Sequence, residues 1–202
     1  MKVLYATGND SKVYNMKRRL KGLPIEIVTP KDLGIKVQII EDGNNAIENA
    51  KKKALAYYQK TKIPTIAGDS GLYINNIAKE KQPGLFVRRV NGKELTDNEM
   101  IEYYQKLVEE VGGKSIAYYV TGLAIVTEKG IETSEIKEDE FILTSKVSEN
   151  IKHNGNPLDI ISVDPICNKY YTEMTDKDFA YLGQTFDKKC VEFIVTNLIN
   201  KP

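Results

Sequence analysis

The hydrophobic residues of this chain recur at two spacings, one typical of strands and the other of helices. Short apolar runs predict strands at residues 2–6, 25–28, 64–67, 115–127, 131–136 and 141–145. Apolar residues that return every three or four positions predict helices at residues 11–21, 45–58 and 96–111, and near the end of the chain at 190–198. The first third therefore alternates strands and helices, and the middle is a run of strands.

Small and polar residues mark where these elements begin and end. Asn44 or Asn45 suits the N-cap of the second helix, and Thr96 with Glu99 has the spacing of a capping box. The third strand is expected to end in a loop at residues 68–71, which is rich in glycine. This order predicts an α/β fold with a mixed central sheet, flanking helices and a cleft.

Composition narrows the class of protein. The chain has 202 residues, of which 41% are hydrophobic and 28% charged, as expected of a globular protein with a real core. The net charge of +1 argues against a nucleic-acid partner, and no apolar run approaches the roughly 20 residues of a membrane span. The apolar start is too short for a signal-peptide core, and Cys167 and Cys190 suggest neither a disulfide framework nor a zinc site. We therefore expect a cytoplasmic protein.

The first loop with more polarity than packing requires is Thr7-Gly8-Asn9, after the first strand. A junction of strand and helix presents free backbone N–H groups and the positive end of the helix dipole, so anions bind there. Gly8 would let the backbone approach a ligand, and Lys12, one turn into the helix, could reach a phosphate. A tight connection with a solvated lysine is the alternative, because the full P-loop pattern is missing.

The second such loop is Gly68-Asp69-Ser70-Gly71. Core packing explains poorly why an acidic residue is held between glycines after an apolar strand. The Asp69 carboxylate could bind magnesium and orient or deprotonate a water molecule. An Asx-type turn is the structural alternative.

The third loop is the acidic segment Glu41-Asp42-Gly43 ahead of the second helix. Its two carboxylates precede the helix and stay free to face a cleft. Lys53 would add positive charge beside them, although a run of lysines such as 51–53 is also typical of a solvated helix face. Glu48 suits the helix dipole. Together the three loops suit a nucleotide polyphosphate with magnesium.

The order of these segments resembles the inosine triphosphate pyrophosphatase family, whose members hydrolyse noncanonical purine nucleoside triphosphates. That family opens with a strand and Thr-Gly-Asn-x-x-Lys, matched by residues 7–12. It continues with Glu-Asn-Ala-x-x-Lys-Ala, matched by residues 48–54, and with an Asp-Asp-Ser-Gly-Leu loop, matched by Gly-Asp-Ser-Gly-Leu at residues 68–72. A Pro-Gly segment that ends in arginine follows, matched by residues 83–89.

The resemblance implies one domain over residues 1–202, with two α/β lobes around a nucleotide cleft, and a homodimer. It also implies a magnesium-dependent reaction in which water attacks the α-phosphorus and yields a nucleoside monophosphate and pyrophosphate. Asp69 would be a metal ligand and the general base, and Glu41 would help to hold metal or water. The residues implied to bind the substrate are Thr7, Gly8, Asn9, Lys12, Lys53, Ser70, Arg89 and Asp164.

The chain departs from the family pattern in four places. Ile40 and Gly68 stand where the family has acidic residues, one before the second helix and one before Asp69. The Phe-Gly-Tyr-Asp-Pro segment of the family appears as Ile161-Ser162-Val163-Asp164-Pro165, and Ala180-Tyr181-Leu182 replaces its Ser-His-Arg signature. The phosphate end is thus retained and the base end is rebuilt, which leaves the preferred base open.

Two other functions remain in view from the sequence. A nucleotide-binding regulatory protein with impaired hydrolysis would explain Ile40 and Gly68, and a phosphatase could instead act on another phosphorylated metabolite. Tyr170, Tyr171 and Tyr181 are candidates to stack on a base. His153, the only histidine, is expected in a surface loop.

Overall fold

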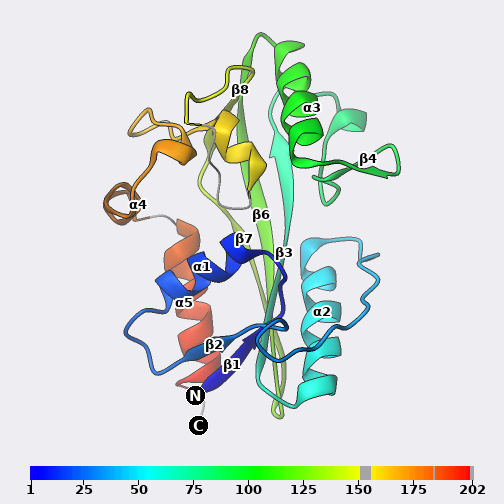
Figure 1. The fold of residues 1–202 in the computed structure, drawn as a ribbon, viewed down its shortest axis with the longest axis vertical. Helices are drawn as coiled ribbons and strands as arrows, with labels where there is room; N and C mark the ends of the chain where they lie inside the picture. The colour runs from blue at the N-terminus through cyan, green and yellow to red at the C-terminus, as the bar shows by residue number, and fades with distance from the viewer. Residues whose placement is uncertain (151–155, 184, 201–202) are drawn as a thin grey trace. The chain divides into compact units, whose positions relative to one another are not determined.

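The structure, a computed structural model, describes residues 1–150, 156–183 and 185–200 and has a mixed α/β fold (Figure 1). Its helices are α1 (Asp10–Arg19), α2 (Ala46–Thr61), α3 (Asp97–Glu109), α4 (Asp176–Leu182) and α5 (Thr185–Leu198). Its strands are β1 (Lys2–Tyr5), β2 (Glu26–Val28), β3 (Thr65–Ile74), β4 (Arg89–Val90), β5 (Lys93–Glu94), β6 (Lys114–Thr127), β7 (Gly130–Lys137), β8 (Phe141–Thr144) and β9 (Ser162–Val163). Short 3-10 helices cover Lys79–Lys81, Pro157–Ile161 and Tyr171–Glu173.

Most strands belong to one mixed sheet, as the sequence predicted. Its order is β2-β1-β3-β6-β8-β9, and β7 also pairs with β6, whereas β4 and β5 form a separate small sheet. The pairs of β1 with β2 and β3 are parallel, and β8 pairs with β6 and β9 in the antiparallel sense. The chain divides into two compact units, the first with Met1–Ser70, Thr121–Ile136 and Phe186–Pro202, the second with Gly71–Val120 and Lys137–Thr185.

The first unit has hydrophobic side chains packed on both faces of its strands. Met16 of α1 and Ile194 of α5 pack against Val3 and Leu123 on one face. On the other face, Ala50, Ala54 and Tyr57 of α2 pack with other small apolar side chains of the strands. Figure 1 accordingly shows α1 and α5 on one side of β1 and α2 on the other. This sandwich fixes where the loops between these elements emerge.

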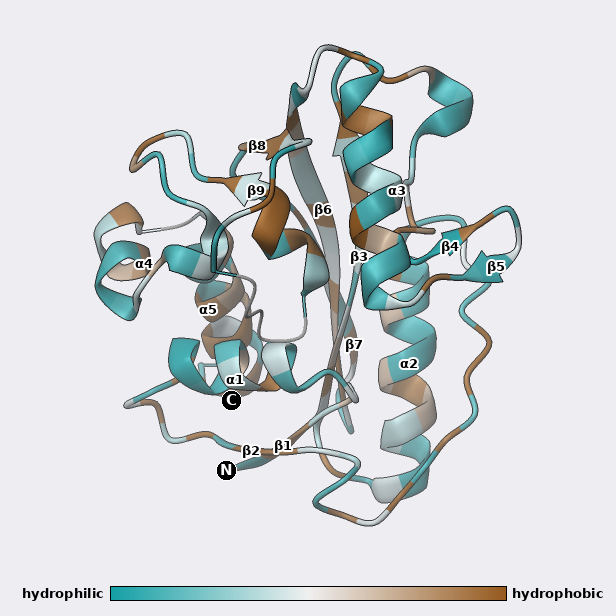
Figure 2. Cartoon of the chain, turned by 45° about the horizontal axis from the view of Figure 1, so that its top comes forward, coloured by the Kyte–Doolittle hydropathy of each residue, from teal (hydrophilic) through white to brown (hydrophobic). Residues whose placement is uncertain are grey.

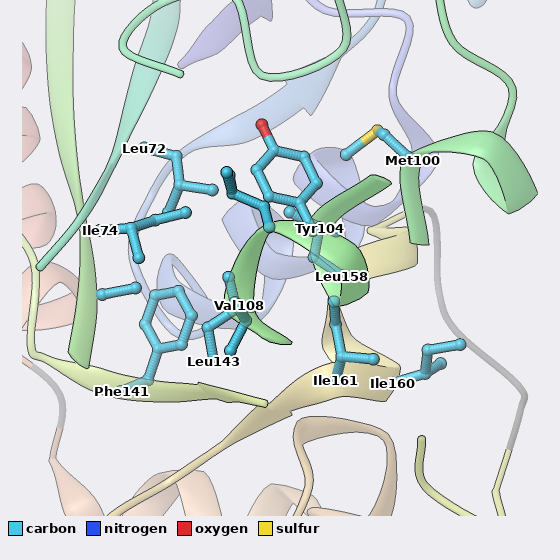
Figure 3. Close-up of a cluster of buried hydrophobic side chains, with 12 residues drawn as sticks. Leu72, Ile74, Met100, Tyr104, Val108, Phe141, Leu143, Leu158, Ile160 and Ile161 are labelled. Carbon is cyan, nitrogen blue, oxygen red and sulfur yellow. The ribbon is translucent and has the colours of Figure 1, made fainter. Parts of the chain in front are cut away.

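The second unit has its own core, which Figure 3 shows. Tyr104 of α3 is fully buried among Leu72, Phe141 and Leu158, and its hydroxyl donates a hydrogen bond to the carbonyl of Val87 at 2.9 Å. Burial raises the pKa of Tyr104 well above its ordinary value, so the hydroxyl stays a donor. Figure 2 shows α3 with both hydrophilic and hydrophobic residues, as a helix with one buried face requires.

The structure corrects one boundary that bears on function. The segment of residues 68–71 is not a loop, because β3 continues through it to Ile74. Gly68 and Gly71 keep extended backbone, so their glycine character does not break the strand. The sequence also gave no sign of α4, β4, β5 or β9. His153 lies outside the described residues.

Candidate functional site

The register of the parallel strands brings two of the predicted segments to the same end of the sheet. Tyr5, the last residue of β1, pairs with Ile66 of β3, and the amide of Ala6 still donates to the carbonyl of Ile66 at 2.8 Å. The chain then leaves the sheet at Thr7, while β3 continues to Asp69. Both therefore lie just past the carboxyl end of β1, where open α/β sheets bind ligands.

Asn9 shapes the start of α1. Its side chain is the N-cap and accepts a hydrogen bond from the amide of Lys12 at 3.1 Å. The amide of Asn9 donates to the hydroxyl of Thr7 at 3.2 Å, which closes the turn between strand and helix. Three residues of the predicted phosphate-binding segment thus hold one another in place.

Gly8 lies between them and is exposed. A Cβ at this position would meet no atom within 4 Å, and the residue does not have a positive φ. Neither packing nor backbone conformation therefore requires glycine here. Among the described residues, the amides of Gly8, Asp10 and Ser11 have no hydrogen-bond acceptor. Such a set of amides at the N-terminus of a ten-residue helix suits an anion.

The start of α2 rests directly on β6. A Cβ at Gly122 would lie 2.5 Å from the carbonyl carbon of Ala46 and 2.7 Å from the Cα of Ile47, so only glycine allows this contact. Since β6 neighbours β3 in the sheet, the first turns of α2 lie beside β3. Asn45 caps the helix by accepting from the amide of Glu48 at 2.9 Å, and the Glu48 carboxylate in turn accepts from the amide of Asn44.

The acidic segment is fastened along the first turns of α2. Lys53 and Glu41 form an ion pair of 3.0 Å, and Lys52 pairs with the more exposed Asp42. The amide of Gly43 donates to Oδ1 of Asn49 at 2.8 Å, and a Cβ on Gly43 would collide with that oxygen. The glycine is thus required for the close approach that orders the segment.

Asp69 faces the same helix. Its Oδ2 accepts a hydrogen bond from Nδ2 of Asn49 at 2.8 Å. The other carboxylate oxygen, Oδ1, accepts no hydrogen bond from any residue in the described ranges. Asn49 itself is only 3% exposed, so this contact is shielded from water. The predicted carboxylates Asp69 and Glu41 are therefore both held by α2, through side chains one helical turn apart.

Ser70 points to the other face of β3, because successive side chains of a strand alternate. Its hydroxyl lies 2.6 Å from the hydroxyl of Thr121 on β6. Gly68 belongs to that face as well, and a Cβ there would lie 3.2 Å from Cδ2 of Leu123 and 4.0 Å from the hydroxyl of Tyr5. The expected first aspartate of the acidic motif is thus replaced where the neighbouring core leaves little room.

The remaining predicted residues lie in the second unit. The guanidinium carbon of Arg89 lies 5.5 Å above the ring centre of Phe86. Asp164 is 6% exposed, and its Oδ1 accepts from the amides of Ile166 and Cys167 at 2.9 Å each. This oxygen therefore fixes the turn that follows β9, whatever else the residue does.

Gly84 of the Pro-Gly segment and Gly71 of β3 lie against each other for a structural reason. Leu72 and Gly84 exchange two backbone hydrogen bonds of 2.9 and 3.0 Å. A Cβ on Gly71 would lie 3.2 Å from the backbone of Gly84, which itself has a φ of 50°. These two motifs of the sequence are therefore paired in space.

Magnesium is the metal that the sequence predicts, and its preferred ligands can be compared with the side chains present. Within the described ranges no three carboxylate, histidine or cysteine side chains cluster as a metal site. Magnesium, however, is commonly held by one or two carboxylates with substrate phosphates and water completing its shell. Oδ1 of Asp69 suits one ligand of such an ion, and Glu41, which pairs with Lys53, is the second carboxylate that the sequence predicts for it.

Sequence reasoning missed three residues of this site. Asn49 was noted only as part of a motif, although its spacing of four from Lys53 places both on one face of α2. Thr121 and Gly122 lie in a long β-like run that carries no signal of their contacts with Ser70 and α2.

Comparison with known proteins agrees with the fold. Residues 3–178 match the model of the Ham1 family. The chain is 32% identical over 183 residues to the dITP/XTP pyrophosphatase of Thermoanaerobacter pseudethanolicus, covering 90% of this chain and 85% of that protein. It is 30% identical over 197 residues to the dITP/XTP pyrophosphatase of Leptospira interrogans, covering 97% of this chain and 96% of that protein.

Solved structures show the same architecture. A HAM1 protein from Coxiella burnetii superposes with a TM-score of 0.74 at 23% identity and covers both chains completely. The Ham1 protein of Staphylococcus aureus gives a TM-score of 0.66 at 20% identity, over 89% of this chain and 90% of its own. The resemblance found in the sequence is confirmed, and the chain belongs to the Ham1 family.

Proposed function

We propose that this chain hydrolyses noncanonical purine nucleoside triphosphates, such as inosine and xanthosine triphosphates and deoxyinosine triphosphate, to the monophosphate and pyrophosphate. The chain is a hydrolase of nucleotide metabolism, a nucleoside triphosphate pyrophosphohydrolase. Its relatives from Thermoanaerobacter and Leptospira, both dITP/XTP pyrophosphatases, support this activity. The observation that carries the proposal is the Asp69 carboxylate, which is hydrogen-bonded through one oxygen and open at the other.

The triphosphate binds at the start of α1 in this proposal. The amides of Gly8, Asp10 and Ser11 offer hydrogen bonds to phosphate oxygens, and exposed Gly8 lets the anion come close to the backbone. Thr7, Asn9 and Lys12 shape this segment and add polar groups to it. Lys53 and Ser70 are further phosphate ligands.

Hydrolysis requires a water molecule aimed at the α-phosphorus. The open oxygen Oδ1 of Asp69 accepts the proton of that water, and Asn49 keeps the carboxylate turned in one direction. Lys53 offsets negative charge that builds on the phosphate oxygens. The reaction needs a divalent metal ion, which we propose to be magnesium held by Asp69 and Glu41; when bound, it neutralises phosphate charge and activates water.

The proposed function also involves residues of the second unit and the setting in which the chain works. Arg89 and Asp164 contribute to the binding of the nucleotide, and the altered base-end segments set the preferred base. The chain forms a homodimer and works in the cytoplasm, where Cys167 and Cys190 stay reduced. Nucleic acid and membranes are not partners in this proposal. No helix within the described part of the chain is long and apolar enough to cross a membrane.

A pyrophosphate-release screen tests the proposed function. The purified chain is assayed with magnesium against common and noncanonical nucleoside triphosphates, and with sugar phosphates and dinucleotides as other metabolites. We expect turnover of the inosine or xanthosine triphosphates and its loss in Asp69→Asn, which keeps the size of the side chain. Release of inorganic phosphate from another metabolite alone would overturn the proposal.

A binding protein without turnover is the second candidate, and Gly68 and Ile40 favour it, since they replace acidic residues of the family pattern. Its signature is different. Tight binding of a triphosphate in calorimetry, with no pyrophosphate released by the wild type, would select it over the enzyme.

A further inference from the structure

We infer that Asn49 is a positioning residue that sets the direction of the Asp69 carboxylate and couples it to the acidic segment of residues 41–43. This inference rests on the proposed function, because it assigns a role within the same site. It goes beyond that function, since Asn49 contacts neither substrate nor metal in the proposal. Its basis is a set of hydrogen bonds inside the first unit.

The side-chain amide of Asn49 makes a hydrogen bond through each of its two ends. Oδ1 accepts from the amide of Gly43 at 2.8 Å, and Nδ2 donates to Oδ2 of Asp69 at 2.8 Å. A backbone N–H can only donate, and an ionised carboxylate can only accept. The orientation of the amide is therefore dictated by its neighbours, and only a side chain that both accepts and donates can join the two.

Capping of α2 does not require the side chain of Asn49. Asn45 caps α2, and Glu48 closes the first turn by accepting from the amide of Asn44. Asn49 follows that turn and packs at 3% exposure between the acidic segment and β3. A buried asparagine at such a place normally costs stability in a helix, and an apolar residue would suffice for packing. The amide of Gly43 and the carboxylate of Asp69, which Asn49 connects, explain why a polar side chain is buried here.

Contacts with α2 orient the carboxylates of both Asp69 and Glu41. The hydrogen bond from Asn49 to Oδ2 limits rotation of the Asp69 carboxylate and leaves Oδ1 without a hydrogen bond among the described residues. Lys53, one turn further along the same face, holds Glu41 at 3.0 Å. The two carboxylates proposed as metal ligands thus take their orientation from one face of one helix. Removing a residue that hydrogen-bonds to a metal ligand typically lowers metal affinity or activity by 10- to 100-fold.

Two variants of Asn49 separate its two hydrogen bonds. Asn49→Leu has nearly the same size and removes both. Asn49→Asp still accepts from the amide of Gly43 but replaces the donor to Asp69 with a carboxylate oxygen, so it removes that hydrogen bond and adds repulsion between the two carboxylates. Asn45→Ala is the matched control, because it removes the N-cap of α2 and lowers the melting temperature without changing the contact with Asp69.

Each variant is tested in two measurements. The first gives kcat and KM for pyrophosphate release from the best triphosphate of the screen. The second is the rise in melting temperature that magnesium causes in the presence of a nucleotide whose α,β-bridging oxygen is replaced by methylene. We expect both Asn49 variants to lose about 10- to 100-fold in kcat, with KM changed less than threefold, and to lose most of the magnesium-dependent rise. Asn45→Ala should melt earlier but keep kcat and the rise.

The exchange Asn49→Asp with Asp69→Asn supplies a further check. It restores the hydrogen bond with its ends reversed, so the melting temperature should recover toward that of the wild type while turnover does not. Equal losses in Asn45→Ala and the Asn49 variants would reduce Asn49 to a structural role and overturn the inference, as would wild-type kcat in Asn49→Asp.

The failure of this inference can be told from that of the proposed function. If the wild type releases no pyrophosphate, the proposed function fails and the magnesium-dependent rise alone decides the role of Asn49. A wild type that shows no such rise would overturn the inference as well.

Discussion

Lys53 on α2 forms an ion pair with Glu41 at 3.0 Å, although Glu41 lies twelve residues earlier in the chain. The side chain of Lys53 is 15% exposed and that of Glu41 is 32% exposed, so the pair is more shielded than the neighbouring contact of Lys52 with Asp42. Glu41 thus holds the ammonium group of Lys53 in place. In the proposed function, a triphosphate would meet a cation that is already oriented.

Lys53→Met should lower kcat/KM about tenfold or more. The substitution removes one charge-assisted contact, worth about 1.5–3 kcal/mol, and leaves Glu41 without its partner. Lys52→Met is the control, because its exposed pair with Asp42 contributes little, and we expect kcat/KM within twofold of the wild type. Steady-state kinetics at saturating magnesium measure kcat/KM for both variants and the wild type. Equal effects of the two substitutions would show that Lys53 is only a solvated lysine.

Gly8→Ala should weaken nucleotide binding and leave the fold unchanged. A Cβ at this position meets no protein atom within 4 Å and the backbone has no positive φ, so the melting temperature should stay the same. The methyl group would instead occupy the space where we place the phosphates, and KM should rise several-fold. Thermal melting beside steady-state kinetics measures both quantities. A normal KM in Gly8→Ala would show that the phosphates do not bind at this loop.

Gly122→Ala, in contrast to Gly8→Ala, should lower the stability of the fold. Its methyl group would lie 2.5 Å from the carbonyl carbon of Ala46, so α2 must shift or the chain must strain. Overpacking of this kind costs about 1–3 kcal/mol of the free energy of unfolding. Urea denaturation should show that loss, and kcat should fall as well because Asn49 and Lys53 move with the helix. Unchanged stability would mean that the helix start adapts freely.

Asp159 should make stability depend on pH. Burial raises the pKa of Asp159 to about 7, and its Oδ1 accepts a hydrogen bond from Nδ2 of Asn156 at 2.6 Å. The folded state therefore holds a proton that the unfolded state loses near pH 4, and stability falls as the pH rises from about 4 to 7. Asp159→Asn should remove this slope and be more stable than the wild type at pH 8. Urea midpoints between pH 5 and 8 measure it, and parallel curves for the two proteins would contradict the assignment.

Local signals predicted much of the fold. The N-cap at Asn45 and the capping box of Thr96 and Glu99 are confirmed, because each depends on residues within one helical turn. The first strand, its polar turn and α1 were found for the same reason. Elements such as β9 and α4 escaped, since they are short and carry little periodicity of their own.

The sequence named the residues of the proposed site but not how they lie in the fold. Asp69 and Ser70 were expected in one loop between glycines, yet the strand continues and turns their side chains to opposite faces. Glycines at 68 and 71 suggested a break, but they serve close packing against Leu123 and Gly84. The hydrogen bond from Asn49 to Asp69 joins residues twenty positions apart, and nothing in the local pattern announces it.

The continuation of β3 through Asp69 has a consequence for the entropy of the reaction. A carboxylate on a loop must be ordered each time a substrate arrives, and fixing the backbone of one residue costs about 1–2 kcal/mol. Here the sheet already orders the main chain of Asp69, and the hydrogen bond from Asn49 restrains its carboxylate. If Asp69 is the general base that we propose, it is ordered before any nucleotide binds, and binding energy remains available for lowering the barrier.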